Sequence, residues 1–104
     1  MMNSSQDLTL SKIEIYILIA LMSKPIEAEY GLVIEQLKEM ITSIENIDLL
    51  NFNDFSLNLN LTKLKNKQLI NSSFNFSIHF YDLTENGSNW LIENESILTE
   101  LLSL

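Results

Sequence analysis

Two short stretches decide the fold of this chain: residues 61–70, LTKLKNKQLI, and residues 81–87, YDLTENG. In the first, Leu61 and Leu64 have helical spacing, and the apolar pair that ends the stretch is typical of the start of a strand. In the second, Thr84 is a residue type that caps helices. The chain is therefore predicted to leave one helix at the first stretch and to enter another at the second.

A β-hairpin is predicted between these stretches. Phe76, Ile78 and Phe80 alternate with the residues at 77, 79 and 81, as a half-buried strand requires. Residues 71–75 would form the tip of the hairpin. A helix, a short hairpin and a further helix, in this order, make up the second half of a winged helix-turn-helix. In that fold the helix before the hairpin enters the major groove of DNA.

Residues 54–67 allow two interpretations. Residues 55–61, FSLNLNL, alternate strictly, which is a strand pattern. However, Leu57, Leu61 and Leu64 form an i, i+4, i+7 stripe that favours a helix with these leucines in the core. We expect the helix, with Asn53 or Asp54 as its N-cap. Four residues would then face outward: Leu59, Thr62, Lys63 and Asn66.

Two further helices are expected in the first half of the chain. The first begins at Ser11, which forms a capping-box pattern with Glu14, and ends near Ser23 before Lys24–Pro25. It is apolar nearly all round, so it should be a central buried helix or part of a dimer interface. The second is predicted from Glu27 to Thr42 because apolar residues recur there at helical steps: Ile26, Tyr30, Val33, Ile34, Leu37, Met40 and Ile41.

The remaining segments complete a single domain. Residues 1–10 are expected to form a flexible polar arm, residues 43–52 a loop or turn tucked under the core, and residues 11–104 one winged-helix domain. The last helix is predicted over about residues 85–102 and is more apolar than its own domain requires, so a second copy is a natural partner. The expected fold class is α+β, mostly α.

Composition narrows the possible functions. The chain has 104 residues, no cysteine and a single histidine, His79, so thiolate chemistry and a metal-ligand cluster are not expected. No serine–histidine–carboxylate pattern or glycine-rich phosphate loop occurs, and we therefore predict no enzymatic activity, no metal and no cofactor. The aromatic residues Tyr16, Tyr30 and Trp90 are expected in the core or an interface, with a stacked flat ligand as the alternative. With no expected membrane segment or signal peptide, a cytoplasmic location is expected.

The net charge of −8 is unevenly distributed. Residues 55–81 contain Lys63, Lys65 and Lys67 and no acidic residue, whereas residues 82–104 contain five acidic residues and no basic one. Local charge matters more than total charge for contact with phosphates, so an acidic protein with this segment could still bind DNA. The alternative is that the three lysines are only solvated surface charges.

Three segments give the chain a resemblance to the PadR-like winged-helix transcriptional regulators, which are related to MarR-type regulators. Residues 17–37 resemble the family pattern ILxxL…P…yGYeIxxxL, residues 56–70 resemble TLYxxLxxLxxxGLI, and residues 81–87 resemble YxLTxxG. The chain departs from the family at Leu32, Asn58 and Gln68, where the family has an aromatic residue, a tyrosine and a glycine. A left-handed residue after the helix is easier for glycine than for Gln68, so this turn is expected to differ. The expected wing is short and, unlike family wings, lacks lysine and arginine.

The resemblance implies a homodimer that binds a pseudo-palindromic site in double-stranded DNA. The residues that would contact DNA lie on the expected recognition helix: Ser56, Asn58, Asn60, Thr62, Lys63, Lys65, Asn66 and Lys67. The candidate dimerisation residues are apolar positions of the first and last helices: Ile15, Ile19, Trp90, Leu91, Ile97, Leu98, Leu101 and Leu102. Leu59 could contact a thymine methyl group or another protein. The alternative function is a winged-helix protein–protein interaction module that has lost DNA binding.

Overall fold

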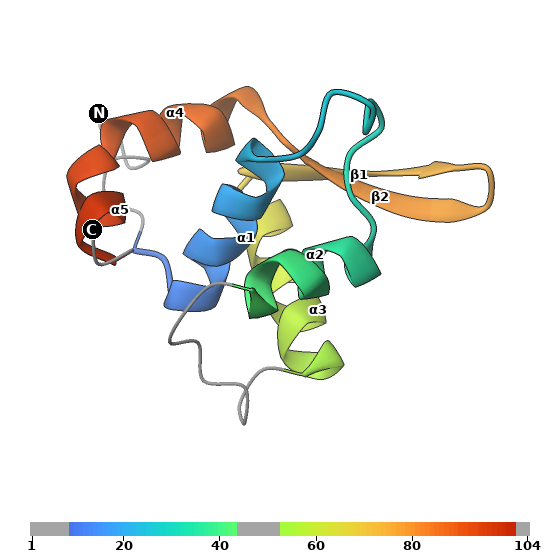
Figure 1. The fold of residues 1–104 in the computed structure, drawn as a ribbon, viewed down its shortest axis with the longest axis horizontal. Helices are drawn as coiled ribbons and strands as arrows, with labels where there is room; N and C mark the ends of the chain where they lie inside the picture. The colour runs from blue at the N-terminus through green and yellow to red at the C-terminus, as the bar shows by residue number, and fades with distance from the viewer. Residues whose placement is uncertain (1–8, 44–52, 102–104) are drawn as a thin grey trace.

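The computed structural model describes residues 9–43 and 53–101, and it confirms a mostly helical α+β fold (Figure 1). Three helices come first, followed by a two-stranded antiparallel hairpin and two short C-terminal helices: α1 Lys12–Met22, α2 Ile34–Thr42, α3 Asp54–Asn66, β1 Ile70–Asn75, β2 Ile78–Leu83, α4 Glu85–Glu93 and α5 Glu95–Leu101. This order is compatible with a winged helix. Most of the predicted arm, most of the predicted loop at 43–52, and Leu102 lie outside the described residues.

The helix α1 is the centre of the core, which is one of the two alternatives that its apolar sequence predicted. Ile17, Leu18 and Leu21 are almost completely buried, and α1 packs against α2, α3, α4 and β2. Its N-terminus has the predicted capping box: the Ser11 hydroxyl accepts from the Glu14 N–H, and the Glu14 carboxylate accepts from the Ser11 N–H. The sequence therefore predicted both the start and the burial of this helix.

Residues 54–66 form a helix rather than a strand. Leu57, Leu61 and Leu64 are buried, and Leu59 is 44% exposed, as the leucine stripe predicted. The Asn53 side chain caps the helix by accepting from the N–H of Ser56. Burial of three leucines on one face stabilises the helix by several kcal/mol, roughly 2 for each side chain, and this outweighs the local strand pattern.

The predicted start of the second helix was wrong. Residues 27–33 are not helical, and α2 begins only at Ile34. Gly31 has φ +114°, and Leu32 pairs with Tyr81 of β2 through two backbone hydrogen bonds of 2.8 Å. Ile26, expected on the apolar face of that helix, is 96% exposed. Pairing with the hairpin, a contact distant in sequence, overrides the local helical period.

The tip of the hairpin also differs from the prediction. Residues 71–75 belong to β1, and the tip is the two-residue turn Phe76–Ser77. Both turn residues have positive φ, 55° and 63°, which is the geometry of a type I′ turn. Asparagine and glycine usually occupy this type of turn, so the residues Phe76 and Ser77 did not indicate a turn. Phe76 therefore lies in the turn, not in the strand where it was expected.

The predicted single helix over residues 85–102 is divided into α4 and α5. The Thr84 hydroxyl caps α4 by accepting from the Gly87 N–H, as expected. At Asn94 the helix stops: the Asn94 side chain donates to the Trp90 carbonyl, and the Asn94 carbonyl starts the next turn by accepting from Ile97. None of the described helices is long and apolar enough to cross a membrane.

Candidate nucleic-acid interface

The helix α3 presents one continuous exposed face. Its members recur at steps of three and four residues, so they lie along one side of the helix. They are Phe55, Asn58, Leu59, Thr62, Lys63 and Asn66, and Lys65 is also exposed. Ser56 is only half-buried, and its N–H is bound to the cap. Seven of the eight predicted DNA-contact residues therefore lie at least partly at the surface of α3 or of its C-cap: Ser56, Asn58, Thr62, Lys63, Lys65, Asn66 and Lys67.

Two of these polar side chains also bind the helix backbone. The Asn58 amide donates to the Asp54 carbonyl at 2.9 Å, and the Thr62 hydroxyl donates to the Asn58 carbonyl at 3.0 Å. The side-chain oxygens of Asn58 and Thr62 keep free lone pairs, and the Asn58 amide has a second N–H to donate. Both residues can therefore still bind an external partner, from an orientation held by the helix.

Asn60 does not belong to this face. Its side chain is 8% exposed, donates to the Ser56 carbonyl at 2.7 Å and accepts from the Ser11 hydroxyl at 3.2 Å. Asn60 thus joins α3 to the N-terminus of α1. The family resemblance had implied that Asn60 contacts DNA together with Asn58, but two residues along a helix turn the side chain by about 200°, toward the core.

Lys67 is also drawn away from the outward face. Its amine forms an ion pair with Glu14 at 2.8 Å, and the Glu14 side chain is only 3% exposed. The other carboxylate oxygen of Glu14 accepts from the Ser11 N–H. The positive charge of Lys67 is therefore neutralised in the packing of α1 against α3.

The charge that remains on α3 comes from two lysines. Within the described part of the chain, no ion pair involves Lys63 or Lys65. At the start of the helix, Asp54 pairs with Lys38 of α2 at 2.7 Å. The hydrogen bond that the Lys38 amine donates to the Asp54 carboxylate, together with the negative charge of Asp54, raises the pKa of Lys38. The charge of the single acidic residue of α3 is thus neutralised, and the C-terminal half of the helix is positive.

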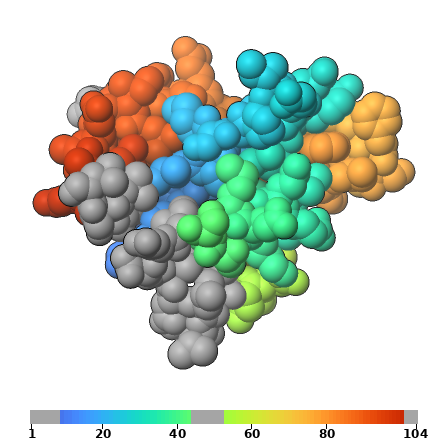
Figure 2. Space-filling model, viewed as in Figure 1, coloured from blue at the N-terminus to red at the C-terminus, as the bar shows by residue number. Residues whose placement is uncertain are grey.

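The hairpin beside α3 is apolar and aromatic rather than basic. Phe74, Phe76 and Ile78 are 62%, 77% and 46% exposed. The ring of Tyr30, from the segment before α2, lies 5.7 Å from the rings of both Phe76 and Phe80. The hairpin stands out from the body of the protein (Figure 2). Sequence reasoning missed this exposed surface because it placed Phe76 on a half-buried strand.

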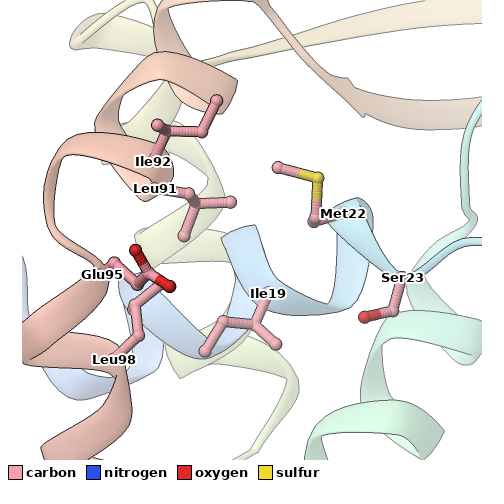
Figure 3. A pocket seen from close by; sticks show the side chains of 7 residues that line it. All are labelled: Ile19, Met22, Ser23, Leu91, Ile92, Glu95 and Leu98. Atoms are coloured by element: carbon pink, nitrogen blue, oxygen red, sulfur yellow. The ribbon is translucent and has the colours of Figure 1, made fainter.

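A second surface feature is an apolar groove between α1, α4 and α5 (Figure 3). Its volume is about 380 Å³, and side chains from all three helices line it: Ile19, Met22, Ser23, Leu91, Ile92, Glu95 and Leu98.

Only some of the predicted dimerisation residues lie at this groove. Ile19, Leu91 and Leu98 line it, whereas Ile97 on α5 is 45% exposed and is not among the lining residues. Ile15 and Trp90 are 7% and 6% exposed and serve the core of their own chain. The side chains of Leu101 and Leu102 lie outside the described residues.

No metal site is formed by the part of the chain that the structure describes, because no three histidine, aspartate or glutamate side chains gather there. His79 instead lies against the ring of Phe74, with 4.8 Å between the ring centres. Comparison of the chain with models of protein families, with curated proteins and with solved structures found no significant match. The geometry of α3 and the hairpin is therefore the basis on which a function is proposed.

Proposed function

We propose that this protein is a PadR-like winged-helix transcriptional regulator that binds a pseudo-palindromic DNA site as a homodimer. One observation carries the proposal. The helix before the hairpin exposes a face with Asn58, Thr62, Lys63 and Asn66, and no acidic residue occurs between residues 55 and 81. A helix with this position and chemistry suits the major groove.

The proposed contacts divide into two kinds. Lys63 and Lys65 would bind phosphates and set affinity, because phosphate contacts carry no sequence information. Asn58, Thr62 and Asn66 would meet base edges, where asparagine pairs well with adenine N6 and N7. Leu59 lies on the same face and would contact a thymine methyl group.

The proposal is tested by removing the positive charge of α3. Lys63→Gln with Lys65→Gln is expected to weaken DNA binding by at least tenfold, measured by fluorescence anisotropy on fragments selected from genomic DNA. The matched control is Ser96→Glu with Thr99→Glu on α5, which changes the net charge by the same amount on exposed positions away from α3. Equal affinity of both variants, or no enrichment of any palindrome in the selection, contradicts the proposal.

A second candidate function is supported by the apolar part of the same surface. Phe55 is 76% exposed and Leu59 44% exposed, and the neighbouring hairpin is uncharged at its tip. Exposed apolar surface of this kind is typical of protein-binding sites. If the chain is a protein interaction module, Leu59→Asp abolishes capture of its partner while the fold is retained. Retention of every captured protein by Leu59→Asp excludes this alternative.

A further inference from the structure

The two edges of the hairpin are in different situations. On the outer edge of β2, the Leu32 N–H donates to the Tyr81 carbonyl and the Tyr81 N–H donates to the Leu32 carbonyl, both at 2.8 Å. This edge is therefore paired with the segment before α2. The outer edge of β1 has no such neighbour among the described residues.

The register shows which groups of β1 point outward. Because Tyr81 uses its N–H and carbonyl on Leu32, its opposite residue Ser72 must direct both of its own groups away from β2. In an antiparallel ladder this pattern recurs at every second residue, so the N–H and carbonyl of Phe74 also point outward. Ser72, Ser73 and Phe74 are all exposed. The backbone N–H and carbonyl groups of Ser72 and Phe74 are therefore available to pair with another strand.

This edge lacks the features that usually prevent strand addition. β1, with the sequence INSSFN, contains no lysine, no proline and no charged residue, and its register with β2 has no bulge. It is the one described strand or helix without a formally charged side chain. In a protein of net charge −8, two copies can approach along β1 without bringing carboxylates together.

We propose that two copies of this chain pair through their β1 strands, antiparallel and in register about a two-fold axis at Ser73. Ser72 of each copy then lies opposite Phe74 of the other, and each such pair exchanges two backbone hydrogen bonds. The pairing is self-complementary, as a two-fold interface requires, because the same two residues supply the donors and acceptors on both sides. The two serines at the axis are small enough to lie face to face, and the exposed Phe74 rings cover the neighbouring serines.

The groove between α1, α4 and α5 is a less favourable contact between copies. The helices α4 and α5 carry Glu85, Glu93, Glu95 and Glu100 and no basic residue, so a two-fold contact there doubles a local negative charge. The β1 pairing goes beyond DNA binding and does not depend on it. It also assigns a role to β1, which has no positive charge with which to bind phosphate.

The test uses the whole chain without DNA, in sedimentation equilibrium at chain concentrations up to roughly 1 mM, the range in which small interfaces associate. Ser72→Pro removes an outward N–H, and proline is tolerated at such a position of an edge strand. Ser73→Lys places two ammonium groups face to face at the axis. Each variant is expected to raise the dimer dissociation constant at least tenfold, while the amide spectrum of the rest of the hairpin is unchanged.

Two controls separate this interface from others. Ser96→Lys on α5 adds the same charge as Ser73→Lys and is expected to leave the dimer constant within about twofold, as an exposed position outside the contact should. Ile92→Glu places a charge on a residue that lines the groove and is also expected to leave the dimer intact. A monomeric wild-type protein, or a dimer that survives Ser72→Pro but is lost in Ile92→Glu, overturns the proposal. DNA affinity is measured separately with the Lys63 and Lys65 variant, because two copies that are monomeric in solution can still occupy the two halves of a palindromic site.

Discussion

Gln68 ends α3 in a left-handed conformation, with φ 64°. The N–H of Leu69 donates to the Leu64 carbonyl at 3.0 Å and the N–H of Gln68 donates to the Lys65 carbonyl at 2.9 Å, which together form a Schellman motif. The apolar contact usual in that motif is available here because Leu64 and Leu69 are both buried. Glutamine thus occupies the left-handed position of a regular C-cap in this chain, although the sequence had led us to expect a different turn here.

At this residue, Gln68→Gly is expected to stabilise the protein by about 0.5–1 kcal/mol, because glycine occupies the left-handed region without the penalty paid by other residues. The free energy of unfolding in urea measures the change. Gln68→Ala is the control and should give no gain, since alanine has the same Cβ strain. A loss of stability in Gln68→Gly contradicts the argument.

At the scale of elements, the packing of α1 against α3 uses polar side chains that the sequence had assigned to DNA. Asn60 binds Ser11, and Lys67 binds Glu14, so both hold the outward helix in position. The segment before α2 has a similar positioning role, because Leu32 extends the hairpin at Tyr81. Gly31 makes this approach possible: a Cβ there would lie 2.1 Å from the Tyr81 carbonyl oxygen.

Gly31→Ala is therefore expected to lower the free energy of unfolding by about 3 kcal/mol, because a backbone clash adds to the strain of a positive φ. Urea unfolding, with the amide signals of the hairpin as a local probe, measures the effect. Glu29→Ala in the same segment is the control, and as an exposed substitution it should change stability by less than about 0.5 kcal/mol. If Gly31→Ala changes the free energy of unfolding as little as the control does, the pairing of Leu32 with Tyr81 contributes little to stability.

For the whole molecule, the important feature is that charge is distributed unevenly over an acidic protein. Among the residues that the structure describes, three of the six lysines form ion pairs: Lys24 with Asp82, Lys38 with Asp54 and Lys67 with Glu14. Only lysines outside such pairs can bind phosphate without losing an existing partner. On α3 these are Lys63 and Lys65.

The salt dependence of DNA binding follows from this count. Two lysines from each of two copies give a slope of log affinity against log salt of about −3.6, at roughly 0.9 per phosphate contact on duplex DNA. Titrations at several salt concentrations on one selected fragment measure it. A slope near −5.4, the value for about six contacts, would show that Lys67 leaves Glu14 when DNA binds, and a slope near zero would contradict phosphate contact.

The sequence by itself determined the features that depend on neighbours three or four residues away. These include the capping box at Ser11, the cap at Thr84 and the burial of the leucine stripe on α3, because caps and helical periodicity are local. Only the tertiary structure decided the late start of α2, the inward direction of Asn60 and the pairing of Lys67 with Glu14. Each of these depends on a partner from another element, and the energy of such a contact exceeds the local preferences that sequence patterns report.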